Sequence, residues 1–407
     1  MPTTQSRFSF LQCSECTKVY PPDEVNTYAS CSKCSKNVLV SKYTDLLQIT
    51  KEDIDSEVRS MWRYASLLPV FDTQNIVSLG EGWTPIVQLD RMGLDLGMTQ
   101  LYLKDESFNP TGSFKARGMS VAISKAKELG IKKCIVPTAG NAGGAMSAYC
   151  AKAGIEAVVV MPIHTPEAFK KECLLFGAEL ILEKGLISDC ARKVGELNRD
   201  NEYFDLSTLK EPYRLEGKKT MGYEIAEQLD WKLPDVILYP TGGGTGLIGM
   251  WKAFHEMIEM EWIENRLPRM VAVQAENCSP IVETWFGNQP NAEGYQGEFT
   301  IANGLAVPRP MGEKMILRIL HETGGHPVAV GDEEILVAVR EVAKKEGMLI
   351  APEGAALIAA LKRLIREGSI HRDAHVLLLN TGSGYKYLEN LTSTVKHPLA
   401  IQLTNKG

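Results

Sequence analysis

The chain has 407 residues, of which 44% are hydrophobic and 23% are charged, with a formal net charge of -6. This length and apolar content predict two or three domains with large buried cores. The acidic balance argues against a general nucleic-acid-binding protein, and no apolar run is long enough to cross a bilayer. The first residues lack the charged-then-apolar layout of a secretion signal, so we expect a cytoplasmic protein without a membrane partner.

Four of the nine cysteines form two C-x-x-C pairs near the start of the chain. Cys13 and Cys16 make the first pair, Cys31 and Cys34 the second, and 14 residues separate them. Two such pairs are typical of a zinc ribbon, in which four thiolates surround a structural Zn²⁺ ion. The alternatives are two disulfides or four free thiols. With four protein ligands the metal site would be closed and therefore not catalytic.

From about residue 101 onward, segments that read as buried strands alternate with segments that read as helices. This alternation predicts an α/β fold with mostly parallel sheets, in which ligands bind where strands end and helices begin. The expected strands are 101–106, 132–137, 156–162, 179–183, 235–240, 269–276 and 375–380. The expected helices include 115–129, 141–154, 166–178, 245–257, 333–347 and 354–368.

Lys115 lies in the stretch "NPTGSFKARGM", at the first turn of the helix expected from 115. A helix N-terminus is already partly positive, so a lysine there is either solvated or neutralised by chemistry. The turn "TGGGTG", from Thr241 to Gly246, follows a strand and opens a helix, so its backbone amides can hold an anion. It matches neither a Walker motif nor a dinucleotide fingerprint, and a compact phosphate monoester fits it better.

Two further turns are rich in small residues. "PTAGNAGG" places Asn141 at a helix start, with the backbone amides of residues 138–142 available for a carboxylate. "NTGSG" offers the hydroxyls of Thr381 and Ser383 after a buried strand. A lysine for an aldehyde, a glycine turn for a phosphate, an amide for a phenolic oxygen and a hydroxyl for a ring nitrogen together indicate pyridoxal 5'-phosphate.

The motifs "NPTGSFKARG", "TAGNAGGA", "PTGGGTG" and "NTGSGYK" resemble, in this order, those of fold type II pyridoxal phosphate enzymes, the tryptophan synthase β group. The resemblance covers about residues 78–387 and implies two open α/β domains with the cofactor in the cleft between them. It implies that Lys115 is the Schiff-base lysine, that Phe114 backs the ring, that Asn141 contacts O3' and that Thr381 contacts the pyridine nitrogen. The phosphate cup would be Gly242, Gly243, Gly244 and Thr245.

Within this group the chain is most similar to the threonine synthase family, which converts O-phospho-L-homoserine and water into L-threonine and phosphate. The cysteine pairs, "LGEGWTPIVQL" and "YRLEGKKTMGYEIAEQL" carry this resemblance. It implies that Arg214, with Lys218 beside it, holds the substrate phosphate. The expected substrate-binding residues are therefore Thr138, Ala139, Gly140, Ala142, Arg214 and Lys218.

Two positions depart from the threonine synthase pattern. Ala142 stands where that family commonly has a threonine, and "TLKEP" at 208–212 stands where it often has N-S-x-N-P. "TAGNAGG" and "TGSFKARG" also suit serine/threonine dehydratases, so a dehydratase, or another elimination enzyme such as a cysteate synthase, is the alternative. A catalytically inactive regulator is a further alternative, which the intact Lys115 disfavours.

The domain organisation that follows has three parts. Residues 1–42 form the ribbon module, 43–100 with 216–407 form a large cofactor-binding domain, and 101–215 form a small domain with Lys115 and Asn141. We expect a homodimer, as is usual for the group, with a small amino acid as substrate and no nucleic-acid partner.

Overall fold

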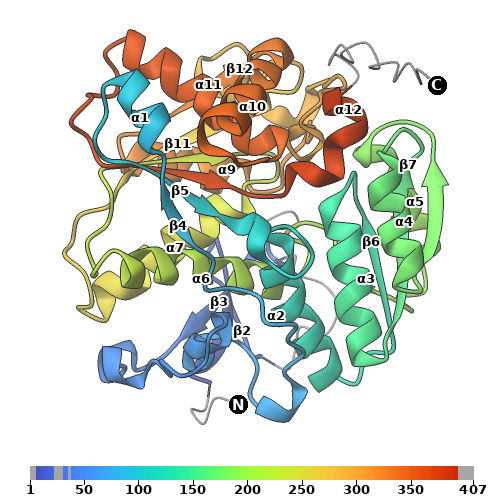
Figure 1. Ribbon diagram of the computed structural model, residues 1–407. Coiled ribbons are helices and arrows are strands. Elements are labelled where there is room, and N and C mark those ends of the chain that lie inside the picture. Colours follow the sequence, from blue (N-terminus) through green and yellow to red (C-terminus); the bar gives the residue numbers. More distant parts are fainter. Residues whose placement is uncertain (1–5, 23–30, 35–37, 393–407) are drawn as a thin grey trace, which may run out of the picture.

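The computed structural model describes residues 6–22, 31–34 and 38–392, and its described parts are built around three sheets (Figure 1). The largest is six-stranded in the order β12-β11-β10-β13-β5-β4. Its strands are parallel except β4, which pairs antiparallel with β5 at one edge. The strands of this sheet are β4 (Ile86–Gln88), β5 (Leu101–Asp105), β10 (Val236–Pro240), β11 (Arg269–Ala275), β12 (His326–Val330) and β13 (Val376–Asn380).

The second sheet has four parallel strands in the order β8-β7-β6-β9. It comprises β6 (Lys133–Pro137), β7 (Glu156–Pro162), β8 (Glu179–Glu183) and β9 (Phe204–Asp205). The helices α3 (Asn141–Ala153), α4 (Glu167–Leu175) and α5 (Ile187–Leu197) pack around it, and this unit is drawn in green in Figure 1. Each strand-to-helix turn of such a parallel sheet opens at the same edge.

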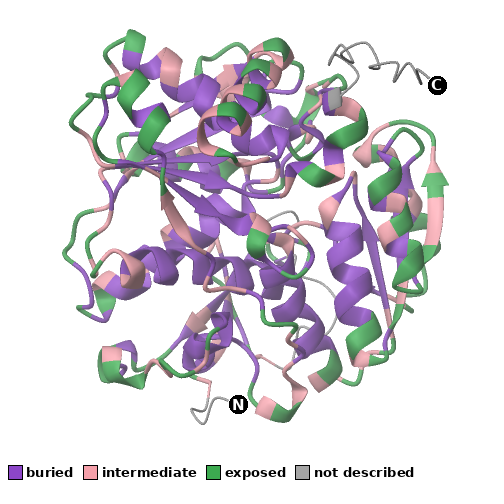
Figure 2. Ribbon diagram, viewed as in Figure 1, coloured by how far each residue is buried: buried purple, intermediate pink, exposed green. Residues whose placement is uncertain are grey.

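Both sheets are covered by helices, and the central strands β10 and β13 of the six-stranded sheet are buried along their whole length (Figure 2). Strands covered on both faces are continuously apolar rather than alternating, as "VILYP" and "VLLLN" are. α11 packs against strands of the six-stranded sheet, while α2, α6 and α7 pack on one another. The remaining helices are α1 (Asp90–Leu96), α2 (Lys115–Glu128), α6 (Tyr213–Gln228), α7 (Thr245–Glu259), α8 (Pro280–Trp285), α9 (Glu313–Glu322), α10 (Asp332–Glu346), α11 (Pro352–Arg366) and α12 (Leu388–Thr392).

The third sheet is a small antiparallel one near the start of the chain. It consists of β1 (Phe8–Cys13), β2 (Val19–Tyr20) and β3 (Leu39–Tyr43). Tyr43, at the end of β3, donates its buried hydroxyl to Glu216 Oε2 on α6 at 2.7 Å. Lys219 Nζ lies 3.9 Å from the centre of the Tyr43 ring. The small sheet is therefore docked on α6 by buried polar contacts.

The expected strands and helices are confirmed, as is the α/β class with mostly parallel sheets. The three-part domain division stays a prediction, and two of its boundaries do not coincide with the ends of elements in the structure. Residues 101–105 were assigned to the small domain, but β5 pairs in register with β13 of the six-stranded sheet. The boundary at residue 216 falls inside α6. A buried strand such as "LYLKD" fits either sheet equally well, and only long-range pairing decides between them.

A buried network of charges joins α2 to α6 and to the end of β5. The guanidinium of Arg117 contacts Glu106 at 2.6 Å and Glu224 at 2.5 Å, and all three side chains are fully buried. Lys104 on β5 bonds Glu224 at 2.9 Å from the other side. Although burial opposes ionisation of Glu224, the charges of Arg117 and Lys104 lower its pKa to about 2. Every buried charge in the network has a partner of opposite sign. Moving the first turn of α2 would separate these partners and leave a buried charge unpaired, so the network holds that turn in place.

Replacing Arg117 by methionine leaves two buried carboxylates without their shared partner. We expect Arg117→Met to lower the free energy of unfolding by about 3–5 kcal/mol. The control is Arg266→Met, which removes the exposed Arg266–Asp235 pair and should cost less than about 1 kcal/mol. Urea unfolding followed by circular dichroism measures both, and equal losses would contradict a special role of the buried network.

Candidate active site

Lys115 is the first residue of α2. Backbone contacts join the loop before it to the turn that follows β13. Ser113 forms a bridge with Gly382, and the backbone N–H of Phe114 donates to the carbonyl of Thr381 at 3.1 Å. The Lys115 ammonium lies 4.3 Å from the centre of the Phe114 ring. Two segments more than 260 residues apart in the sequence therefore lie side by side, and this brings Lys115 near Thr381.

The glycine turn follows β10 and ends at α7, which begins at Thr245. Gly244 has φ of 72°, a left-handed conformation that glycine adopts without strain. A side chain at Gly242 would overlap the carbonyl of Gly304. The turn is therefore a tight backbone cradle at a helix N-terminus, where N–H groups favour an anion.

The asparagine turn lies at the carboxyl end of β6. Asn141 begins α3, and Thr138 Oγ1 accepts a hydrogen bond from the N–H of Gly140 at 3.0 Å. This turn follows β6 of the four-stranded sheet, whereas the glycine turn follows β10 of the six-stranded sheet. Each turn lies at the carboxyl edge of its own sheet, where ligands of parallel sheets bind.

These turns face a single pocket. The expected residues that line it are Phe114, Lys115, Thr138, Ala139, Gly140, Asn141, Ala142, Arg214, Gly242, Gly243, Gly244, Thr245 and Thr381. Lys218, which was expected to bind substrate, does not line this pocket. Its side chain is fully buried and its Nζ lies 5.4 Å from the centre of the Phe114 ring.

Comparison with known proteins agrees with this geometry. Residues 77–382 match the family model described as pyridoxal-phosphate dependent enzyme. The chain is 33% identical to the threonine synthase of Methanocaldococcus jannaschii, over 96% of both chains. It is 36% identical to the threonine synthase of Methanosarcina acetivorans, over 96% of this chain and 95% of that one. The chain belongs to the threonine synthase family of pyridoxal-phosphate-dependent enzymes.

The fold is shared more widely than the family. The structure of diaminopropionate ammonia lyase from Escherichia coli superposes with a TM-score of 0.65 at 20% identity, over 80% of this chain and 92% of that one. Threonine deaminase isoform 2 from Solanum lycopersicum gives a TM-score of 0.64 at 18% identity, over 83% of this chain and 94% of that one. The fold type II expectation is confirmed, and the threonine synthase family is distinguished from these neighbours by sequence along its whole length.

The pocket makes Lys115 a reactive amine. Burial, and to a smaller extent the positive charge of Arg214, lower the pKa of Lys115 to about 7, while the charge of Glu353 partly opposes them. An amine with this pKa is about half neutral at pH 7, and the neutral form is the one that attacks an aldehyde or accepts a proton.

Two more buried cations lie close to Lys115. Arg214 is 3% exposed, and its Nη1 donates to the carbonyl of Leu206 while its Nε has no partner among the described residues. Burial, with the charges of Arg214 and Lys115, lowers the pKa of Lys218, whose Nζ also lacks a partner there. The buried carboxyl group of Glu211 acts on both groups, but no carboxylate among the described residues forms an ion pair with either side chain, so the Arg214 side of the pocket favours an anion.

Several lining residues were missed by sequence reasoning. Glu353, at the start of α11, lines the pocket although it belongs to none of the four motifs. Its Oε1 accepts hydrogen bonds from Gly304 N at 2.7 Å and from the Tyr387 hydroxyl at 2.8 Å, and burial raises its pKa. The other missed lining residues include Ile187, Thr208, Tyr239, Asn303, Gly304, Leu305 and Val307. The 303–307 segment follows no strand and carries no motif, so no local pattern could have identified it.

The depressed pKa of Lys115 predicts how cofactor capture depends on pH. Capture needs the neutral amine, so its rate in the cofactor-free protein should rise about tenfold from pH 6 to pH 8 and then level off. Stopped-flow absorbance after addition of pyridoxal phosphate measures the rate. Lys115→Arg is the control and should show no capture. A rate that still climbs about tenfold per pH unit above pH 8 would mean an ordinary lysine.

Proposed function

We propose that the protein is a threonine synthase, which converts O-phospho-L-homoserine and water into L-threonine and phosphate. The observation that carries this proposal is Arg214, a buried guanidinium that lines the pocket with an unpartnered Nε. The glycine turn accounts for one phosphate, that of the cofactor. A second anion is needed beside Arg214, and a substrate phosphate supplies it.

The pocket residues fit pyridoxal phosphate. The glycine turn is a cradle that side chains would fill, Lys115 has a depressed pKa, and Thr381 offers a neutral hydroxyl or carbonyl rather than a carboxylate. We propose that Lys115 binds the cofactor covalently and that Phe114 backs its ring. Asn141 would contact O3', the backbone of residues 242–245 the phosphate, and Thr381 the ring nitrogen. When bound, the cofactor supplies an aldehyde that captures the substrate amine and a conjugated ring that accepts electrons from the adjacent carbon.

The protein's own residues would then bind, orient and move protons. Lys115 Nζ, neutral at working pH, accepts the proton from the substrate α-carbon and later returns one. The backbone amides of residues 138–142 would hold the substrate carboxylate at the N-terminus of α3. Lys218 lies near the Phe114 ring and does not line the pocket, so we assign it no contact with the substrate.

The two departures from the family pattern leave a usable phosphate pocket. Ala142 lines the pocket and offers no hydroxyl, but Thr208 of the "TLKEP" segment also lines it. Glu211 Oε2 accepts from the backbone N–H of Arg214 at 2.9 Å and so braces the start of α6. The dehydratase alternative is less favoured, because serine and threonine carry no second anion to meet Arg214.

An assay of phosphate release tests the proposal. With O-phospho-L-homoserine we expect stoichiometric phosphate and L-threonine, and no turnover with Lys115→Ala. Arg214→Met should raise KM at least about tenfold, because a charged hydrogen bond is worth about 1.5–3 kcal/mol. Lys210→Met removes a more exposed lysine paired with Asp205 and is the matched control. A 2-oxo acid formed from serine or threonine, without phosphate release, would favour the dehydratase instead.

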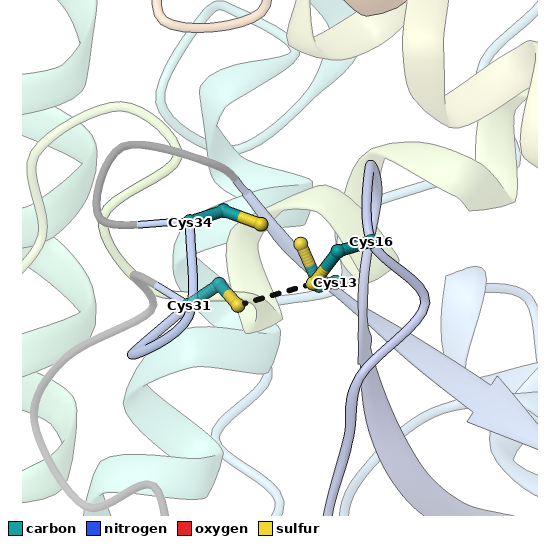
Figure 3. A group of neighbouring side chains, drawn as sticks. All are labelled: Cys13, Cys16, Cys31 and Cys34. Carbon is teal, nitrogen blue, oxygen red and sulfur yellow. Dashed lines mark hydrogen bonds between the residues drawn. The ribbon is translucent and has the colours of Figure 1, made fainter.

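We also propose that the four N-terminal cysteines bind a structural Zn²⁺ ion. Their sulfurs all lie within 4.8 Å of one another, and Cys16 Sγ lies 3.5 Å from Cys31 Sγ (Figure 3). Four thiolates around zinc at about 2.3 Å would be spaced by about 3.8 Å. All four are free thiols in the structure, so the disulfide alternative has no support there.

Metal analysis tests this second proposal. We expect about one zinc per chain in the purified protein, and a lower thermal midpoint after strong chelation, because the small sheet has little core of its own. Cys34→Ser should lose most of the zinc, whereas Cys278→Ser, at a buried cysteine far along the chain, should keep it. Metal-free protein with an unchanged midpoint would contradict the proposal.

The remaining points concern location, assembly and domain organisation. No helix in the described part of the chain is long and apolar enough to cross a membrane. We propose a cytoplasmic homodimer that acts on a small amino acid. We keep the three-part domain division, with residues 101–105 moved to the large domain and the second boundary placed before α6.

A further inference from the structure

Lys386 lies on a short 3-10 helix, Gly384–Tyr387, just after the turn that carries Thr381. Its ammonium reaches from the six-stranded-sheet unit to the four-stranded one. There Nζ lies 2.8 Å from both carboxylate oxygens of Glu172 on α4, and 2.8 Å from the carbonyl of Thr111. It also lies 3.2 Å from Asn141 Oδ1 at the start of α3.

The contact with Asn141 determines which way its amide points. An ammonium group has three donors and no acceptor, so it faces the oxygen of an amide and never the nitrogen. Nδ2 of Asn141 is thereby left as the end that can donate. It lies next to Gly382, 3.4 Å from where a Cβ of that residue would be, in the wall shared with Thr381.

The residues around Lys386 leave room for its ion pair with Glu172 and shield that pair from solvent. A side chain at Gly144 would overlap the carboxylate of Glu172, so this glycine makes room for the acid. The ring of Phe169 lies 5.6 Å from Lys386 Nζ and packs edge-to-face on Tyr387 at 5.3 Å. Both charged side chains are largely shielded, with 17% and 16% exposure.

An ion pair between the two units is the simpler interpretation, and Glu172 alone would satisfy it. That ion pair does not require the contact between Lys386 Nζ and Asn141 Oδ1. This contact directs an N–H donor of the ammonium to an amide that lines the pocket. The positive charge of the Lys386 ammonium beside Oδ1 also polarises the amide and makes its N–H a stronger donor.

We propose that Lys386 is a positioning residue that orients Asn141, so that Nδ2 donates to the phenolic oxygen of the bound cofactor and stabilises its ionised form. Glu172 neutralises the ammonium and holds it in place across the two units. This inference rests on the cofactor placement proposed above, and it is independent of which amino acid is the substrate.

The test uses the visible absorption spectrum of the cofactor-loaded protein, which reports whether the phenol is ionised, together with the dissociation constant of the cofactor. Lys386→Met keeps an unbranched side chain that is one atom shorter and removes its charge. We expect the neutral-phenol band to grow at the expense of the ionised one, and cofactor binding to weaken about tenfold, as loss of one charged hydrogen bond predicts. Lys386→Arg should retain most of the ionised band.

Lys170→Met is the matched control, since Lys170 lies on α4, the helix that carries Glu172, and likewise pairs with a glutamate, Glu167, at 2.8 Å and donates to a backbone carbonyl. It should leave both readouts unchanged. In an Asn141→Ala background, Lys386→Met should add no further spectral change, because its effect passes through that amide. This cycle separates positioning from a general loss of structure.

Other outcomes overturn the inference. A wild-type spectrum in Lys386→Met, with only a lower unfolding midpoint, would make Lys386 a structural ion pair. A further spectral change in the Asn141→Ala background would do the same. If Lys386→Met does not fold, an Arg variant with the spectrum of Asn141→Ala would contradict the role. Failure of the proposed function differs, because it would remove phosphate release and leave these spectral differences in place.

Discussion

The buried contact of Arg117 with Glu106 and Glu224 is the interaction on which the rest of the site depends. Arg117 follows Lys115 by two residues, so fixing its guanidinium fixes the first turn of α2. Lys104 extends the same network to β5, and Glu224 belongs to α6, the helix that carries Arg214 in its first turn. One set of paired charges therefore sets the reactive lysine against the arginine that faces it. Such a network costs desolvation, but it tolerates few alternative arrangements, because each would leave a charge unpaired.

Around this frame the pocket separates two kinds of anion site. The glycine turn is uncharged and would bind an anion through backbone N–H groups at the start of α7. Arg214 is a buried guanidinium near Lys115, and burial together with the charges of Arg214 and Lys115 lowers the pKa of Lys218, so an anion entering beside Arg214 would favour the charged forms of these groups. Burial is the main cause of the lowered pKa of Lys115, and the charge of Arg214 adds to it, so the arginine proposed to hold the phosphate also contributes to the reactivity of the amine.

The residues behind the pocket walls connect its parts. Tyr387 bonds Glu353, and its neighbour Lys386 bonds Glu172 and Asn141, so one short helical turn contacts both sides of the pocket. Tyr43 of the cysteine-bearing sheet bonds Glu216, two residues beyond Arg214 on α6. Since helices are stiff, a module remote from the chemistry is thereby joined to the element that carries the proposed phosphate contact. Its contribution is expected in stability and alignment rather than in the reaction itself.

The sequence by itself determined the α/β class, the family and the turns that form the pocket, because these depend on local patterns: apolar runs, small-residue turns and one lysine at a helix start. It also identified the four cysteines by their spacing alone. The tertiary structure decided what depends on long-range pairing. It placed β5 beside β13 and Lys218 near the Phe114 ring instead of in the pocket lining, and it brought Glu353 to the pocket wall and Lys386 to Asn141. No local pattern distinguishes a helix-terminal glutamate that caps from one that faces a cavity, since both occupy the same first turn. That difference lies in which distant segments surround the side chain, and only packing of the whole chain fixes it.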